Sequence, residues 1–466
     1  MTQYFSTRGG VTGASFTDVL LTGLAPDGGL FIPETWPEVD RTSLGRMAGT
    51  PYADIAFNII QPYIGDDIPK ADLKAILEDV YRNQFDHAAA APMVQIGPNA
   101  WVMELFRGPT LAFKDYALQL LGRLFDYVLE QRGERITIVG ATSGDTGSAA
   151  IEACRHCKNI DIFILHPNGR TSDVQRRQMT TVDAPNVFNI ALDGTFDDCQ
   201  NMVKAMFADE KFNSEVNLSA VNSINWARIM EQIVYYVTAS LSLGGPERKV
   251  SFAVPTGNFG NVYAAYCARR MGVPIERLII GSNRNDILTR FFENGVMQSS
   301  TVEPSLSPSM DIQISSNFER YLCDAMDRDT KSLATLMKAF KEQGKFNLGD
   351  EYMARARKEF DARRCTDEQT KEMMAACYKE TGYMIDPHTA VGLFSAWQIR
   401  QDPSIPLIAL ACAHPAKFPD AVEQATGVKP ELPDHLSDIF ERKEIYDVLP
   451  NNLARVQTYV RERRTA

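Results

Sequence analysis

Short apolar runs alternate with amphipathic segments from residue 134 onward, and this alternation is the pattern that most constrains the fold. The runs that we interpret as strands lie at 135–141, 160–165, 186–192, 249–255, 277–282 and 406–412. Strands that alternate with helices predict a parallel sheet with helices on its faces. Because the order restarts near residue 249, we predict an α/β fold with two open, twisted α/β domains. The crevice between two such domains is the expected ligand site.

The pattern changes in two other regions of the chain. Residues 1–92 are mixed and rich in turns, whereas residues 319–385 are charged, Met-rich and helical. A chain of 466 residues is too long for one ordinary core. The predicted parts are an N-terminal domain at 1–92, a large α/β domain at 93–133 and 231–430 with a helical insertion at about 319–385, a small α/β domain at 134–230, and a C-terminal extension at 431–466.

The composition argues against several classes of function. A net charge of -11 and a pI of about 5.2 disfavour nucleic acid and anionic membranes as partners. No stretch approaches the roughly 20 apolar residues of a membrane span, and the N-terminus lacks a signal core, so we expect a cytoplasmic protein. The eight cysteines are sparse, and Cys154 and Cys157 lack further zinc ligands at suitable spacing. We therefore expect reduced thiols and no metal site.

The loop A-T-S-G-D-T-G-S at 141–148 is the first of two loops that carry chemistry. It lies between a predicted strand and a predicted helix, and its glycines let the backbone approach a ligand closely. Hydroxyls of Thr142, Ser143 and Thr146, together with free N–H groups at the helix start, suit an anion such as an α-carboxylate. The alternative is an ordinary strand-to-helix turn capped by Asp or Thr.

The loop P-T-G-N-F-G-N at 255–261 also follows a predicted strand and precedes a predicted helix. The backbone of Gly257, Asn258, Phe259 and Gly260 is suited to surround a phosphate dianion with N–H groups. The loop has neither the Gly-Lys-Ser/Thr of a P-loop nor the spacing of a dinucleotide fingerprint. The phosphate must therefore belong to another cofactor or to a substrate.

Lys114 lies in G-P-T-L-A-F-K-D-Y at 108–116, after a Gly-Pro break and beside apolar residues. Desolvation disfavours an ammonium group, and a neutral amine can form a Schiff base with an aldehyde. The alternative is a helix lysine that extends to solvent and pairs with Asp115. An activated lysine, a phosphate loop and a carboxylate loop together match what pyridoxal phosphate needs.

The motifs of this chain resemble those of the threonine synthase family, in its longer class. They are S-T-R-G-G, G-L-A-P-D-G-G-L-F-I-P, E-L-F-R-G-P-T-L-A-F-K-D, A-T-S-G-D-T-G, N-S-I-N-W-A-R-I, P-T-G-N-F-G-N and A-H-P-A-K-F, and they cover essentially the whole chain in the right order. The resemblance implies fold type II of the pyridoxal phosphate enzymes, which is the tryptophan synthase β-like fold. It also implies a lyase that converts O-phospho-L-homoserine and water to L-threonine and phosphate by β,γ-elimination and replacement.

The resemblance also implies roles for individual residues. Lys114 becomes the catalytic Schiff-base lysine. The other expected cofactor-binding residues are Gly257, Asn258, Phe259, Gly260, Asn261 and Cys412, and the expected substrate-binding residues are Thr142, Ser143, Asp145, Thr146, Ser223, Asn225, Arg228 and Lys417. Cys412 departs from the family pattern, in which Thr precedes A-H-P-A-K-F. A thiol is a weaker hydrogen-bond partner for the ring nitrogen, and the alternative is that Cys412 only packs at a strand end.

Three cations are candidates for the substrate phosphate in this acidic chain, namely Arg107, Arg228 and Lys417. His414 is interpreted as a core or supporting histidine rather than a catalytic one. A related phospho-lyase that releases 2-oxobutyrate and a catalytically silent binding protein on the same fold are the competing functions. The expected partner is a small-molecule substrate, and the expected assembly is a monomer or a homodimer.

Overall fold

The computed structural model describes residues 2–142, 144–400 and 402–465. The chain divides into two compact units, each built from separate segments of sequence. The first unit comprises Met1–Arg107 and Ser223–Glu431, and the second comprises Gly108–Asn222 and Leu432–Ala466. Both units are α/β, as the alternation of strands and helices predicts.

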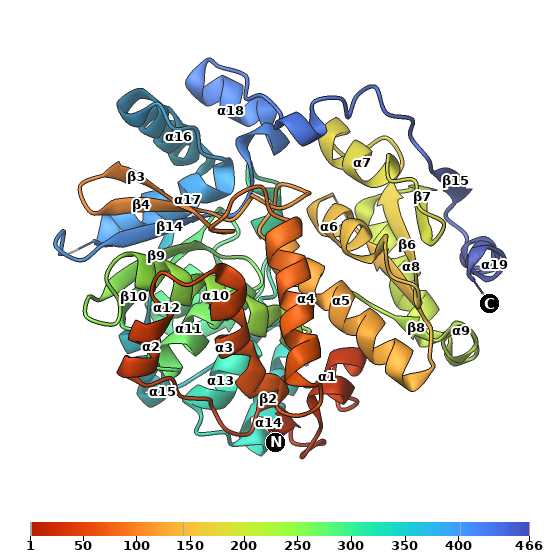
Figure 1. The fold of residues 1–466 in the computed structure, drawn as a ribbon, viewed down its shortest axis with the longest axis horizontal. Coiled ribbons are helices and arrows are strands. Elements are labelled where there is room, and N and C mark those ends of the chain that lie inside the picture. Colours follow the sequence, from red (N-terminus) through yellow and green to blue (C-terminus); the bar gives the residue numbers. More distant parts are fainter. Residues whose placement is uncertain (1, 143, 401, 466) are drawn as a thin grey trace. The chain divides into compact units, whose positions relative to one another are not determined.

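The first unit is organised around a six-stranded sheet with the order β13-β10-β9-β14-β4-β3 (Figure 1). Only the β3–β4 pair is antiparallel. The strands are β3 (Met93–Gly97), β4 (Ala100–Glu104), β9 (Val250–Pro255), β10 (Ile275–Ser282), β13 (Phe360–Arg364) and β14 (Leu407–Ala411). Two small antiparallel pairs join β1 (Tyr4–Ser6) to β2 (Phe31–Pro33) and β11 (Val296–Gln298) to β12 (Lys345–Asn347).

Helices cover both faces of this sheet. In Figure 1, α16 and α17 lie above the sheet, and α11 and α12 lie below it. The helices of the unit are α1 (Phe16–Thr22), α2 (Arg41–Met47), α3 (Tyr52–Ile64), α4 (Lys70–Asn83), α10 (Trp226–Ser242), α11 (Gly260–Arg270), α12 (Ile287–Asn294), α13 (Phe318–Ala325), α14 (Thr330–Gln343), α15 (Asp350–Glu359), α16 (Asp367–Thr381), α17 (Pro387–Ile399) and α18 (Pro419–Thr426), with the 3-10 turns η1 (Pro308–Met310) and η2 (Pro415–Lys417).

The second unit contains a five-stranded, fully parallel sheet with the order β15-β7-β6-β5-β8. Its strands are β5 (Ile136–Ala141), β6 (Ile160–Pro167), β7 (Val187–Asp193), β8 (Leu218–Ser219) and β15 (Asp447–Pro450). Its helices are α5 (Lys114–Arg132), α6 (Asp145–Cys154), α7 (Asp173–Thr180), α8 (Phe196–Ala208), α9 (Glu210–Val216) and α19 (Leu453–Arg463), with the 3-10 turn η3 (Asp434–Leu436). The core of the unit packs Phe163, Leu165 and Ile190 from the sheet against Met202 of α8 and Val456 of α19.

All the strands predicted from the apolar runs are present, with ends shifted by two residues at most. The region 319–385 is mainly helical, but it also contributes β13, which pairs with β10 at the edge of the six-stranded sheet. That strand was missed because F-D-A-R-R is short and charged. Both glycine-rich loops begin where a parallel strand ends, which is where ligands bind in sheets of this kind.

No helix in the described part of the chain is long and apolar enough to cross a membrane. No group of three or more His, Cys, Asp or Glu side chains among the described residues is placed to hold a metal ion. All eight cysteines are buried and free.

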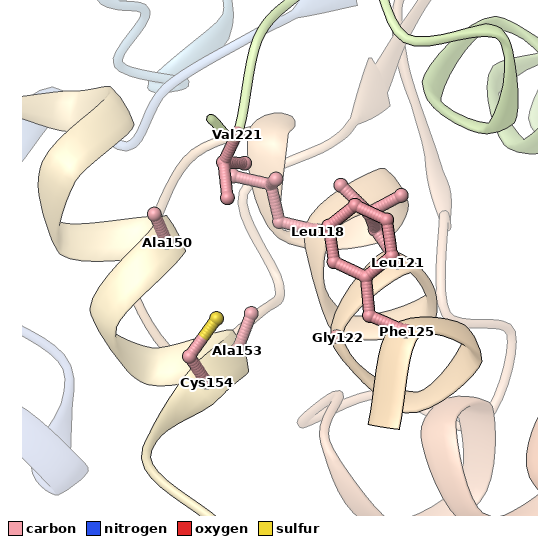
Figure 2. Close-up of a pocket in the computed structure, with 8 residues that line it drawn as sticks. All are labelled: Leu118, Leu121, Gly122, Phe125, Ala150, Ala153, Cys154 and Val221. Carbon is pink, nitrogen blue, oxygen red and sulfur yellow. The ribbon is translucent and has the colours of Figure 1, made fainter. Parts of the chain in front are cut away.

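Helices α5 and α6 pack closely around Gly122 (Figure 2). Leu118, Leu121 and Phe125 of α5 face Ala150 and Cys154 of α6 across a small apolar pocket. A Cβ atom at Gly122 would lie 2.5 Å from the backbone oxygen of Ala153. The glycine therefore sets how closely the two helices approach each other.

We expect Gly122→Ala to lower the free energy of unfolding by about 1–3 kcal/mol, because overpacking against a backbone atom outweighs the gain of about 1 kcal/mol in helix propensity. Chemical denaturation measures the change. Gly97→Ala is the control, since its new methyl would meet Ala100 Cβ at an ordinary 3.6 Å. A Gly122→Ala protein as stable as wild type would contradict the packing argument.

Candidate active site

Lys114 is the first residue of α5, and its side chain is only 11% exposed. Its Nζ lies 3.4 Å from Oδ2 of Asp145 and 5.4 Å from the centre of the Phe113 ring. Asp115 is fully buried, and its carboxylate accepts hydrogen bonds from the backbone and hydroxyl of Thr110 at 2.8 and 2.6 Å. The lysine thus lies in largely dry surroundings with a carboxylate beside it.

The loop after β5 is closed by Thr142. Its Oγ1 accepts hydrogen bonds from the backbone N–H groups of Gly144 and Gly147 at 2.9 and 3.0 Å. The hydroxyl oxygen therefore organises the loop itself, and its proton is left to donate elsewhere. Thr146 is half-buried in the first turn of α6. Ser143, a predicted substrate contact, lies outside the described residues.

Gln175 was not predicted from the sequence, yet it contacts Asp145 directly. Its Nε2 donates to Asp145 Oδ1 at 2.8 Å, and its Oε1 accepts from the Ser172 hydroxyl at 2.9 Å. Gln175 lies in the first turn of α7, which follows the neighbouring strand β6. Gly144 has φ +149°, and a Cβ there would lie 2.6 Å from Gln175 Cδ. One Asp145 oxygen is thus held by Gln175 and the other by Lys114.

The loop after β9 presents amide groups that have no partner within the described residues. None of the hydrogen bonds there uses the N–H of Gly257, Asn258, Phe259 or Gly260. The first bond of the α11 ladder is donated by Tyr263 N–H to the Phe259 oxygen at 2.9 Å. Phe259 has φ +61°, and no side chain caps the helix. Unpaired amides at a helix N-terminus form an anion site.

The carbonyl groups of the same loop are held from the opposite side. The Ser315 hydroxyl donates to Gly257 O at 2.6 Å, and Asn317 Nδ2 donates to Asn258 O at 3.1 Å. The Asn258 side chain accepts from Ser316 N–H at 2.7 Å and donates to the Ser223 hydroxyl. Because the carbonyl groups are anchored to 315–317, the loop is rigid, and its backbone rather than the Asn258 side chain is left to contact a ligand.

Asn261 and Cys412 belong to one buried hydrogen-bond network. The hydroxyls of Tyr235 and Tyr236 each donate to Asn261 Oδ1 at 2.6 Å, and Asn261 Nδ2 contacts Cys412 Sγ at 3.8 Å. Cys412 immediately follows β14, the neighbour of β9, so it lies on the same sheet edge as the Gly257 loop. The network orients the thiol and leaves the Asn261 amide occupied.

Asn225 is the N-cap of α10 and is almost completely buried. Its Oδ1 accepts from Ala227 N–H at 3.0 Å, and its Nδ2 donates to Leu20 O at 2.8 Å. One of the two Nδ2 hydrogens is used in this way, and the role of Asn225 as a substrate donor stays a prediction.

The three candidate cations differ in their pairing. Arg107 is bound to Glu104 at 2.7 Å and lies 3.6 Å from Asp86. Lys417 is buried in η2, next to His414, whose Nδ1 accepts from Ala416 N–H at 3.1 Å.

Arg228 is 3% exposed, and its guanidinium forms no hydrogen bond or ion pair within the described residues; Nε and Nη1 are both buried. Burial lowers the pKa of Arg228 to about 10, so it remains charged at neutral pH.

Comparison with known proteins agrees with these features. The family models that match are "Threonine synthase N terminus" over residues 3–81, "Pyridoxal-phosphate dependent enzyme" over 89–406 and "Threonine synthase, C-terminal" over 389–460. A threonine synthase of Pseudomonas aeruginosa is 55% identical, with 98% of each chain covered. The chain belongs to the threonine synthase family.

Solved threonine synthases have the same fold. The pyridoxal-phosphate-bound threonine synthase of Brucella melitensis superposes with a TM-score of 0.98 at 50% identity, covering all of both chains. The yeast enzyme superposes with a TM-score of 0.94 at 40% identity, covering 99% of this chain and 98% of that one. The predicted family, fold type and pyridoxal phosphate cofactor are therefore confirmed.

The residues of this threonine synthase family member fit the cofactor. The unpaired amides of 257–260 suit a phosphate dianion, and Lys114 supplies the amine that the aldehyde of the cofactor requires. Gly257 is also needed sterically, because a Cβ there would lie 3.0 Å from Ser309 O. The individual assignments of cofactor and substrate contacts remain predictions.

We expect Gln175→Leu to reduce kcat/KM by roughly tenfold to a hundredfold, since a hydrogen bond to a charged group is worth about 1.5–3 kcal/mol. Steady-state kinetics measure the loss, and thermal unfolding of the same sample checks the fold. Asp173→Asn, an exposed change on the same helix, is the control. Kinetics of Gln175→Leu that match the control would show that Asp145 needs no such support.

Proposed function

We propose that this lyase converts O-phospho-L-homoserine and water to L-threonine and phosphate. The observation that carries the substrate assignment is Arg228, a buried guanidinium without a protein partner among the described residues of an acidic chain. A buried charge left unpaired is costly unless a ligand supplies the opposite charge. A substrate phosphate is such a ligand.

Lys114 is assigned as the residue that binds the cofactor aldehyde and then moves protons at the reacting carbons. Bound pyridoxal phosphate supplies the electron sink that stabilises negative charge at the substrate Cα. Lys114 Nζ takes the Cα proton, and the release of a Cβ proton precedes departure of the γ-phosphate. A proton then returns at Cγ, water adds at Cβ, and a proton is finally restored to Cα to give L-threonine. Asp145, held by Gln175, keeps the amine oriented between these transfers.

The remaining contacts are assigned by residue type and by the geometry of each loop. The amides of Gly257, Asn258, Phe259 and Gly260 would hold the cofactor phosphate, and Cys412, in contact with Asn261, would be the partner of the ring nitrogen. The loop residues Thr142, Ser143, Asp145 and Thr146 face the substrate carboxylate or the cofactor ring, and Ser223, Asn225, Arg228 and Lys417 contact the rest of the substrate. For Asn225 this role falls to the second Nδ2 hydrogen, since the first is donated to Leu20 O. We further propose that the protein is cytoplasmic, that it is a monomer or a homodimer, and that its domains have the boundaries predicted from the sequence.

Lys114→Ala should abolish both the visible absorbance of the bound cofactor and the release of phosphate, because no other amine is assigned to either task. Phosphate and L-threonine are measured in the same reaction, together with 2-oxobutyrate. Threonine formation at the wild-type rate by this variant would contradict the role of Lys114. Release of 2-oxobutyrate instead of threonine by the wild-type protein would contradict the proposed reaction.

Arg228→Met should raise KM for O-phospho-L-homoserine by at least about tenfold, since a charge-assisted contact to phosphate is worth roughly 1.5–3 kcal/mol. The fold should tolerate the change, because it removes a buried charge that has no partner among the described residues. Arg107→Met serves for comparison, as that side chain is paired with Glu104. A larger rise in KM for Arg107→Met would place the phosphate at the other cation.

A further inference from the structure

Glu231 is a buried carboxyl group that the proposed reaction does not use. It lies one helical turn after Arg228 on α10 and is 0% exposed. Its Oε1 accepts from the Tyr81 hydroxyl at 2.8 Å and from the Tyr52 hydroxyl at 3.4 Å. Its Oε2 is buried without a hydrogen-bond partner among the described residues.

Glu231 and Arg228 do not form an ion pair, although both are buried on the same helix. Two opposite charges in a low-dielectric interior attract strongly, so their separation needs a cause. Tyr52 on α3 and Tyr81 on α4 supply it, because both hydroxyls hold the same carboxyl oxygen. Their rings pack against each other with centroids 4.7 Å apart, and Tyr81 also stacks on Phe85. The carboxyl group is thus anchored on the N-terminal helices.

The protonation states of the two groups differ at neutral pH. Burial raises the pKa of Glu231 to about 8, with opposing contributions from Tyr81, Tyr52 and Arg228. Burial also raises the pKa of Tyr235 and that of Tyr236 on α10 well above the ordinary value. At neutral pH Arg228 is therefore charged, whereas Glu231, Tyr235 and Tyr236 are neutral.

We propose that Glu231 is a positioning residue for the phosphate site, held apart from Arg228 by Tyr52 and Tyr81 in a dry environment, so that the charge of Arg228 remains available to the substrate. The proposal rests on the phosphate-binding role of Arg228. An ionised Glu231 would compete with the phosphate for that guanidinium and would repel the dianion. Substrate binding therefore favours the protonated form of Glu231, and loss of this proton weakens binding.

The first test compares KM for O-phospho-L-homoserine in wild type and Glu231→Gln as pH rises from about 7 to about 9. The ratio of wild-type KM to Glu231→Gln KM should increase by up to about tenfold one pH unit above the Glu231 pKa. The reason is that the Glu231 carboxyl group ionises over this range, whereas the amide of the variant cannot. Titrations of the substrate itself affect both proteins equally, so the KM ratio isolates Glu231. A ratio that stays constant over this range would overturn the proposal.

A second readout does not depend on activity. The folded-state pKa of Glu231 lies above its ordinary value of 4.5, so ionisation in the unfolded chain destabilises the wild-type fold as pH rises from about 4.5 to about 8. The Tm difference between Glu231→Gln and wild type should widen over that window and then level off. Glu276→Gln, a change at a partly exposed carboxylate that pairs with Lys249, is the control. Parallel Tm profiles of Glu231→Gln and wild type would mean that Glu231 is already ionised.

Rescue separates positioning from general structural damage. Tyr81→Phe frees the carboxyl group to approach and ionise beside Arg228, so KM at neutral pH should rise severalfold while kcat changes little. Adding Glu231→Gln to Tyr81→Phe should restore most of the lost affinity; failure to do so would count against the proposal.

If Arg228→Met leaves KM unchanged, the phosphate assignment itself fails. If Arg228→Met raises KM but the Glu231 profiles match wild type, only the positioning role fails.

Discussion

The orientation of the peptide groups at 257–258 is the constraint on which the first unit depends most. Ser315 and Asn317 bind the carbonyl oxygens from one side, which leaves the amide groups unpaired on the other. Arg320 reinforces this arrangement, because it is fully buried and donates to Asn317, to Phe31 O and to Ile224 O. The Arg320 guanidinium therefore links the 257–258 loop, through Asn317, to strand β2 and to the residues just before α10.

The two buried arginines of this unit illustrate opposite uses of the same side chain. Arg320 donates to two backbone oxygens and to the Asn317 side chain, and its Cζ lies 5.7 Å from the centre of the Trp226 ring. Its charge therefore stabilises the fold. Arg228, two residues after that tryptophan, has none among the described residues. Desolvation lowers the pKa of both arginines to about 10. Only Arg228, which has no partner among the described residues, has its charge available to attract a bound anion.

Much of the fold and part of the site could be predicted from sequence because the signals are local. Strand runs, glycine-rich loops and the lysine motif are contiguous, and the lysine and the two loops together predicted the cofactor. Contacts between distant segments were not predictable: Tyr81 and Glu231 are 150 positions apart, and Gln175 carries no motif. The bond that Asn225 donates to Leu20 O spans 205 positions and was likewise not predicted.

The bonds made by the N-terminal segment bear on how this chain can be shortened. Phe31 accepts from Arg320, Tyr63 donates to Met271 Sδ at 3.1 Å, and the Arg8 side chain pairs with Glu319 at 2.9 Å. The end of the first matched family region, at residue 81, is thus a boundary between sequence families and not between independently folding pieces. A truncation that begins near residue 89 would remove the Phe31 acceptor of Arg320 and the Thr7 and Arg8 donors of Glu319, and so would weaken the polar contacts of α13.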